Sequence, residues 1–287
     1  MRSLAEQVII ITGASSGIGG ATARRLARGG ARLVLGARRA EPLMALAREL
    51  DPAGTRVLAV PADVTVEADR RRLVDTALER FGRIDALVNN AGYGTRGPLE
   101  RVPVELIRRN FETNLFSLIA LTQLVAPHLR GQGSGRIVNI GSVAGRIARP
   151  LSAVYDSTKH ALEAVTDGLR GELAPFGVQV VLVRPGFILT EFVDTANAVS
   201  TPVMEDAGPY APYFKGFQAE YRRYHRIAGR PDCIARLVEK ALVARRPAPR
   251  YAGPGHAKLV LFLRWLLPPR AIDWMVRLRR VSPPAKP

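Results

Sequence analysis

Cysteine and histidine are scarce in this sequence. Cys233 is its single cysteine, so no disulfide can form within the chain, and a reducing compartment is expected. The four histidines and this cysteine show no spacing typical of metal ligands, and we predict no metal site. These absences exclude a fold stabilised by disulfides and argue against a metalloenzyme.

Long apolar runs are also missing. The run at 8–11 and the run KLVLFLRWLL at 258–267 are both too short to span a bilayer or to serve as a signal segment. We therefore expect a cytoplasmic protein without a cleaved leader. Apolar residues still make up 47% of the 287 positions, enough for the core of one large α/β domain or two small ones.

Acidic residues are few compared with basic ones. The chain has 25 acidic and 42 basic residues, 37 of them arginine, and a formal net charge of +17. Such a balance suits nucleic acids, anionic membranes or phosphorylated ligands. The arginines are scattered, however, and no nucleic-acid motif appears. We therefore interpret them as solvated surface residues and predict no nucleic-acid partner.

A glycine-rich turn joins the first predicted strand to the first predicted helix. Residues 8–12 are a short β-branched run typical of a buried parallel strand, and residues 21–30 predict a helix ending at glycine. Glycines let the backbone approach a diphosphate, and a helix N-terminus offers free N–H groups. The predicted phosphate cradle consists of Gly13, Ser15, Ser16, Gly17, Ile18 and Gly19.

The end of the second predicted strand, 32–37, bears on the choice of nicotinamide cofactor. An acidic residue there would accept hydrogen bonds from the ribose of NAD, whereas arginine pairs with the extra phosphate of NADP. The sequence has Arg38 and Arg39 and no acid at 36–39. We predict NADP(H), with Ser15 and Ser16 as further donors to the phosphate. Two solvated surface arginines are the alternative.

Alternating strands and helices with short connections predict an open parallel sheet with helices on both faces. In such sheets ligands bind at the carboxyl ends of the strands. Asp63 is expected there to accept from an adenine amino group, or else to cap the helix at 67–81. Further strands are predicted at 56–60, 84–88, 136–140, 178–183 and 249–252, and further helices at 41–50, 103–130, 154–174 and 232–245.

Ser142, Tyr155 and Lys159 form the candidate catalytic group. Tyr155 and Lys159 are four residues apart and share one face of the predicted helix. A nearby ammonium favours phenolate, so we expect Lys159 to lower the pKa of Tyr155. Ser142 follows a different strand and can bond the same substrate oxygen. Asn114 lies among apolar helix residues, either as a core hydrogen bonder or as an interruption that holds a water near the site.

Taken in order, these motifs resemble the short-chain dehydrogenase/reductase family over residues 1 to about 192. The resemblance implies a Rossmann-type doubly wound sheet in one domain, a dimer or tetramer, and direct hydride transfer from the cofactor. It implies Tyr155 as general acid or base, Lys159 on the nicotinamide ribose, Ser142 on the substrate oxygen and Asn114 in a proton relay. The matching elements are 12–19, Asp63-Val64, Asn89-Asn90-Ala91-Gly92, Asn114, Ser142, 155–159, and Pro185-Gly186 with Thr190.

Two later segments bear on the substrate. Residues 187–230 are rich in aromatics, which predicts a lid over an apolar pocket or, equally, rings that pack the lid onto the body. Residues 257–287 form an apolar run and then a basic amphipathic helix, similar to extensions in steroid-, retinoid- and lipid-type members of the family. We predict a domain at 1–256 and a helical extension that contacts an anionic membrane, covers the substrate mouth or forms an interface.

The predicted function is NADP(H)-dependent interconversion of a carbonyl and a secondary alcohol on an apolar substrate. One alternative is the reduction of a long-chain acyl ketone or fatty aldehyde in lipid assembly. Another is a non-catalytic NADP-binding sensor, which the presence of Tyr155, Lys159 and Ser142 argues against. A serine hydrolase built on Ser142 lacks the glycines that would flank its nucleophile.

Overall fold

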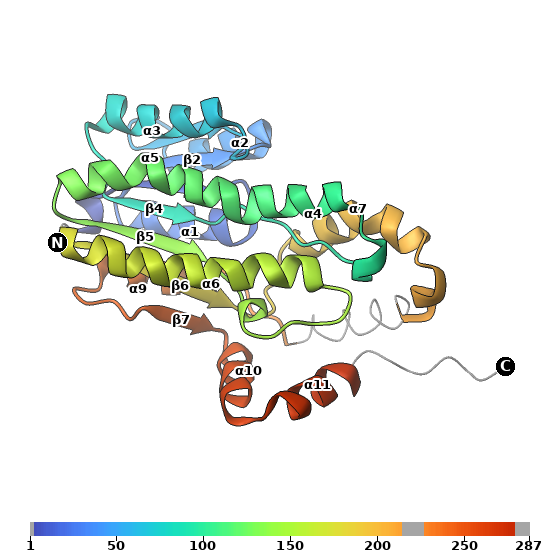
Figure 1. The fold of residues 1–287 in the computed structure, drawn as a ribbon. Helices are drawn as coiled ribbons and strands as arrows, with labels where there is room; N and C mark the ends of the chain where they lie inside the picture. Colours follow the sequence, from blue (N-terminus) through green and yellow to red (C-terminus); the bar gives the residue numbers. More distant parts are fainter. Residues whose placement is uncertain (1–2, 214–226, 279–287) are drawn as a thin grey trace.

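The computed structural model describes residues 3–213 and 227–278, which contain a parallel sheet of seven strands (Figure 1). The order β3-β2-β1-β4-β5-β6-β7 places β1 inside the sheet, and the chain winds outward from it in both directions. The predicted doubly wound sheet is confirmed. Its strands are β1 (Val8–Thr12), β2 (Arg32–Ala37), β3 (Val57–Pro61), β4 (Ala86–Asn89), β5 (Gly135–Ile140), β6 (Val178–Pro185) and β7 (Arg250–Gly253).

Six helices form layers on the two faces of the sheet. They are α1 (Gly17–Arg28), α2 (Ala40–Leu50), α3 (Glu67–Phe81), α5 (Ser117–Gly131), α6 (Ala153–Leu173) and α9 (Pro231–Val243). Successive side chains of a strand point to opposite faces. In β1, Ile9 and Ile11 pack with α1, α2 and α9, whereas Val8 and Ile10 pack with α3 and α5. Burial on both faces explains why the strands are nearly continuous apolar runs.

The predicted helix at 103–130 is divided into three parts. Helix α4 (Val104–Phe111) continues through a π-helical turn, Glu112–Phe116, into α5. Asn114 lies in this turn with only 1% of its surface exposed. The wider turn changes the register of the side chains along the helix, and such turns are frequent at functional sites. Asn114 is therefore both a buried polar residue and part of a helix interruption.

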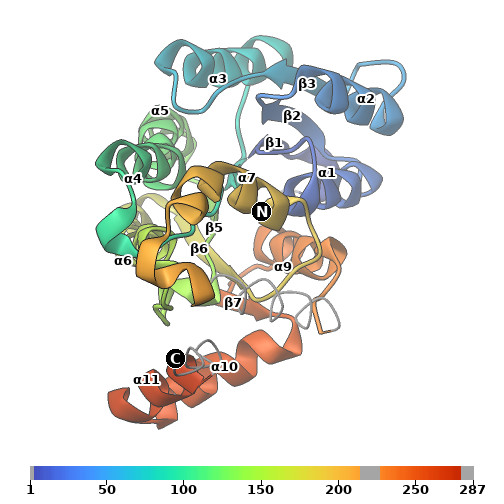
Figure 2. The ribbon, with the colours of Figure 1, turned by 90° about the vertical axis from the view of Figure 1, so that its right-hand side faces the viewer.

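The chain after β6 adds helices outside these layers. Helix α7 (Phe192–Glu205) begins the predicted lid, whose aromatic residues Phe214, Phe217, Tyr221 and Tyr224 and neighbouring His225 lie outside the described residues. Helices α10 (Gly255–Leu266) and α11 (Pro269–Leu278) follow β7 and lie beyond its edge of the sheet (Figures 1 and 2). The extension predicted from residue 257 thus starts within the first turn of α10. No helix in the described ranges is long and apolar enough to cross a membrane.

Candidate active site

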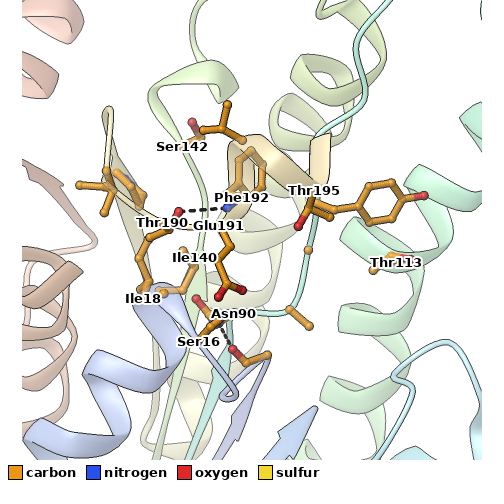
Figure 3. Close-up of a pocket in the computed structure, with 18 of the residues that line it drawn as sticks. Ser16, Ile18, Asn90, Thr113, Ile140, Ser142, Thr190, Glu191, Phe192 and Thr195 are labelled. Atoms are coloured by element: carbon orange, nitrogen blue, oxygen red, sulfur yellow. Dashed lines mark hydrogen bonds between the residues drawn. The ribbon is translucent and has the colours of Figure 1, made fainter. Parts of the chain in front are cut away.

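A cavity of about 350 Å³ lies at the carboxyl ends of the strands. Figure 3 shows that Ser16, Asn90, Ser142 and Thr190 border it from separate segments. The structure brings nearly all predicted site residues to this cavity. Those that line it are Gly13, Ser15, Ser16, Gly17, Ile18, Arg38, Arg39, Asp63, Val64, Asn90, Ala91, Gly92, Ser142, Tyr155, Lys159, Pro185, Gly186 and Thr190.

The glycine turn after β1 forms one wall of the cavity. Gly13 and Gly17 have φ angles of +64° and +55°, a left-handed conformation that glycine adopts without strain. Gly19 does not line the cavity: a Cβ there would lie 2.2 Å from the carbonyl oxygen of Gly13, so glycine is needed for α1 to pack against the turn. The exposed backbone and the N-terminus of α1 fit the diphosphate of a dinucleotide.

Thr12 and Asn90 fasten this turn to the end of β4. The Thr12 hydroxyl accepts hydrogen bonds from the backbone N–H groups of Asn90, at 3.0 Å, and Ala91, at 3.1 Å. The Asn90 side-chain amide donates to the carbonyl oxygens of Thr12, at 2.9 Å, and Gly13, at 3.1 Å. Asn90 therefore holds the cradle in shape as well as lining the cavity.

Arg39 connects three segments around one end of the cavity. Its Nη2 atom donates to Ser16 Oγ at 2.8 Å and lies 3.5 Å from Ser15 Oγ. The same atom pairs with Glu191 Oε2 at 2.8 Å. Ser15, Ser16 and Arg39, all predicted to contact the phosphate, thus lie together, and they share the cavity with Glu191, which the sequence analysis did not identify.

Asp63 lies at the carboxyl end of β3, as predicted, but does not cap the following helix. Its Oδ1 atom accepts from the N–H and hydroxyl of Thr65, at 2.9 and 2.8 Å, and so closes a turn. Helix α3 begins at Glu67 after Val66, without a side-chain cap. The capping interpretation is therefore wrong, because the carboxylate is used one turn earlier.

Ser142 and the α6 residues Tyr155 and Lys159 meet at the inner end of the cavity. Ser142 Oγ accepts from the N–H of Ala144 at 3.1 Å and shares a hydrogen bond with the Tyr155 side chain. Lys159 Nζ donates to the carbonyl oxygen of Ile140 at 2.9 Å and lies 5.9 Å from the centre of the Tyr155 ring. The hydroxyl of Ser142 and the phenol can therefore reach one substrate oxygen.

Burial controls the protonation of this group. It raises the pKa of Tyr155 to about 12, against the lowering effects of Arg149 and of the hydrogen bond with Ser142. Burial also lowers the pKa of Lys159 to about 8. The expected lowering of the Tyr155 pKa by Lys159 is wrong for this structure, because desolvation of the phenolate outweighs the nearby positive charges.

Asn114 contacts the cavity only through a loop. Its Oδ1 atom accepts from the N–H of Tyr93 at 2.9 Å, and its Nδ2 atom donates to the carbonyl oxygen of Tyr93 at 2.9 Å. A third bond, at 3.2 Å, joins Nδ2 to the hydroxyl of Thr158 on α6. Asn114 thus links the loop after Gly92 to the helix that carries Tyr155 and Lys159.

The sequence did not identify three residues that the structure places near the catalytic group. The ring of Phe192 packs edge-on against Tyr155, with centroids 5.4 Å apart. Arg149 binds the fully buried carboxylate of Asp156 at 2.6 Å, and Arg96 donates to Ser152 at 2.6 Å. The sequence offered one indication of a nearby arginine. Asp156 follows Tyr155, and a buried carboxylate requires a cation. The sequence does not say which arginine supplies it.

Comparison with known proteins identifies the same architecture elsewhere. A sequence model for the short chain dehydrogenase family matches residues 7–200. An uncharacterized oxidoreductase of Methylorubrum extorquens is 38% identical over 239 residues, 83% of this chain and 91% of that protein. An NADPH-dependent 3-dehydrocapnine reductase of Ornithobacterium rhinotracheale is 32% identical over 210 residues, 70% and 74% of the two chains.

A solved structure agrees over a greater length. It is a short chain dehydrogenase/reductase of Burkholderia phymatum in complex with NAD, 27% identical, with a TM-score of 0.77 over 100% of this chain and 99% of that one. Fold, motif order and sequence similarity point to a single group of oxidoreductases. The chain belongs to the short-chain dehydrogenase/reductase family.

Proposed function

We propose that this oxidoreductase uses NADP(H) to interconvert a carbonyl and a secondary alcohol on an apolar substrate. The observation that carries the proposal is the meeting of Ser142, Tyr155 and Lys159 at the inner end of the cavity that the glycine turn borders. A hydroxyl, a phenol and an ammonium there can bind an oxygen and exchange a proton with it.

The proposed proton donor for reduction is Tyr155. Because burial raises its pKa to about 12, the phenol stays protonated at neutral pH and can donate to a carbonyl oxygen. Ser142 bonds the same oxygen, and that bond strengthens as negative charge develops on it. A bound nicotinamide supplies the hydride, and Lys159 helps to hold its ribose. Asn114 acts as a positioning residue through Tyr93 and Thr158.

The proposed cofactor preference rests on Arg38, Arg39 and Ser16. Two guanidinium groups and a hydroxyl suit a phosphate on the adenosine ribose, and no acid occurs at 36–39 to bind free ribose hydroxyls. The reductase from Ornithobacterium is named for NADPH, which favours this choice. The Burkholderia structure contains NAD, so relatives of this chain include both cofactors.

An apolar substrate is favoured by the apolar side chains that line the cavity. Phe192 packs against Tyr155, and Phe187 and Ile188 also line the cavity. A steroid, a retinoid or a lipid-like ketone would suit these side chains. Reduction of a long-chain acyl ketone or fatty aldehyde is the second candidate, and product analysis separates the two.

The test is a screen of NADPH oxidation against steroids, retinoids, quinones, aldehydes and long-chain ketones, with NADH in parallel. Tyr155→Phe should abolish turnover of any active substrate while leaving NADPH binding unchanged. A Tyr155→Phe enzyme that keeps most of the wild-type turnover rate would contradict the proposed role of the phenol. NADPH binding without turnover of any carbonyl would instead favour a sensor.

We also propose contact between the helix pair α10–α11 and an anionic membrane. The pair exposes five large apolar side chains, and four basic residues lie on the same two helices. Apolar side chains with tryptophan and flanking cations suit the surface of an anionic bilayer. The exposed apolar residues are Leu259, Phe262, Trp265, Leu266 and Trp274, and the basic residues are Lys258, Arg264, Arg270 and Arg277.

A further inference from the structure

A second cavity of about 270 Å³ lies between the helix pair α10–α11 and the body of the protein. Val260 and Leu263 of α10 and Met275 of α11 line its outer side, and Ile147 lines its inner side. Among the residues 255–266 and 269–277, whose burial the structure describes, only Ala257 and Ile272 are buried. The two helices therefore stand away from the body and leave apolar side chains partly uncovered around an open space.

This second cavity borders the active-site cavity. Val143, Arg149 and Phe187 line both of them. Val143 is the residue after Ser142, and Phe187 follows the Pro185-Gly186 turn. A molecule bound to Ser142 and Tyr155 by its oxygen therefore has an apolar space beside it, on the far side of Val143 and Phe187.

Among the described residues, two ionisable groups line the second cavity, and both are engaged within the protein. His256 Nε2 accepts a hydrogen bond from the N–H of Phe187 at 2.8 Å, and burial lowers the pKa of His256, so its ring is neutral at pH 7. The guanidinium of Arg149 is bonded to Asp156 at 2.6 Å. The other lining residues in the described ranges are apolar, so the space suits hydrocarbon better than a polar group.

We propose that the cavity between α10–α11 and the body binds the apolar end of the substrate, whose oxygen lies at Ser142 and Tyr155. The substrate class is thus an elongated, largely hydrocarbon molecule with its carbonyl or hydroxyl near one end. This inference rests on the proposed carbonyl–alcohol chemistry. It adds a separate binding subsite, and it assigns α10 and α11 as part of the substrate site.

The first experiment measures kcat/KM for NADPH-dependent reduction of methyl n-alkyl ketones from butan-2-one to tetradecan-2-one. Each methylene group that enters the cavity should raise kcat/KM by up to about fourfold in the wild-type enzyme. Val260→Trp and Leu263→Trp fill the cavity and should flatten this rise. Leu266→Trp is the matched control, because Leu266 lies on the same helix, is 56% exposed and does not line the cavity.

The second experiment uses fluorescence of cis-parinaric acid and does not depend on turnover. The probe should bind the wild-type chain and the Leu266→Trp control, and Val260→Trp should weaken binding at least tenfold. Melting temperature and NADPH binding establish that each variant is folded. Equal probe binding by Val260→Trp and Leu266→Trp overturns the subsite. Probe binding without reduction of any ketone would contradict the proposed reaction but support the cavity.

Discussion

Arg39 and Glu191 form an ion pair of 2.8 Å that joins the end of β2 to the loop after β6. Both side chains are about half exposed, and Glu191 points toward Ser16 and Asn90 (Figure 3). The pair therefore crosses the region where we expect the adenosine phosphate of NADP. Glu191 would compete with that phosphate for Arg39, whereas a cofactor without the phosphate meets no such competition.

Replacing Glu191 should favour NADP over NAD. Glu191→Gln removes the competing charge and keeps the size of the side chain, so the affinity for NADP⁺ should rise about two- to fivefold, the range expected for one exposed ion pair. The affinity for NAD⁺ should stay the same. Calorimetric titration of both cofactors measures the effect, and equal gains for the two would contradict competition with the phosphate.

Replacing Arg38 or Arg39 should weaken the preference for NADP over NAD. Arg38→Ala and Arg39→Ala each remove a charged donor, and the Kd for NADPH should rise about 10- to 100-fold. The Kd for NADH should change less than threefold. Fluorescence titration of each variant with both reduced cofactors makes the comparison. A parallel loss of NADH affinity would mean that the arginines only shape the cleft.

Lys159 should make folding stability depend on pH. Its pKa is lowered to about 8 from 10.5, so the folded state disfavours its charge, and this cost is present in full below pH 8. The cost is relieved as pH rises from about 8 toward 10.5. Lys159→Met should therefore be more stable than wild type at pH 7, by on the order of 2 kcal/mol after loss of the bond to Ile140. Urea unfolding from pH 7 to 10 should show this difference shrinking.

Asn114 should stabilise the fold through its hydrogen bonds to the backbone of Tyr93. Asn114→Ala leaves the N–H of Tyr93 without its present partner, while the Tyr93 carbonyl keeps its bond from Asn110, and the loss should destabilise the fold by about 1–3 kcal/mol. Chemical unfolding measures the change, and hydrogen exchange at 91–94 should rise. A cost under about 0.5 kcal/mol, typical of surface positions, would exclude a positioning role.

Exposed tryptophans should govern membrane association. Trp265→Ser with Trp274→Ser should reduce flotation with vesicles containing phosphatidylserine, and 0.5 M salt should reduce it further by screening the basic residues. Phe176→Ser, which removes a 44% exposed ring outside the helix pair, is the matched control. Unchanged flotation of the double variant would count against this surface.

The sequence was sufficient for the sheet and for most of the cleft. Parallel strands buried on both faces are apolar runs, and polar or glycine residues directly after them must gather at one edge of the sheet. Asp63, Asn90, Ser142 and Gly186 could be placed by this reasoning without any knowledge of side-chain contacts. Most boundaries of the predicted elements lie within two residues of those in the structure, but α1 begins at Gly17, four residues before its predicted start.

Properties that depend on burial in the folded protein could not be predicted from the sequence. The raised pKa of Tyr155 depends on how completely the ring is enclosed, which includes Phe192 from another segment. The pairing of Asp156 with Arg149 rather than another arginine depends on the path of the loop between them. The cavity beneath α10 depends on which apolar face of that helix turns inward, and its periodicity does not decide that.

The wall shared by the two cavities would let the proposed active site distinguish the two faces of a substrate carbonyl. In the proposed substrate complex, Ser142 and Tyr155 would hold the substrate oxygen, and Val143 and Phe187, which line both cavities, would direct the longer substituent toward one side. A ketone with one long and one short arm is then fixed at three points, so one face of its carbonyl carbon is presented for reaction. The product would be a single enantiomer, and its configuration would be set by a valine and a phenylalanine that take no part in the proton transfer.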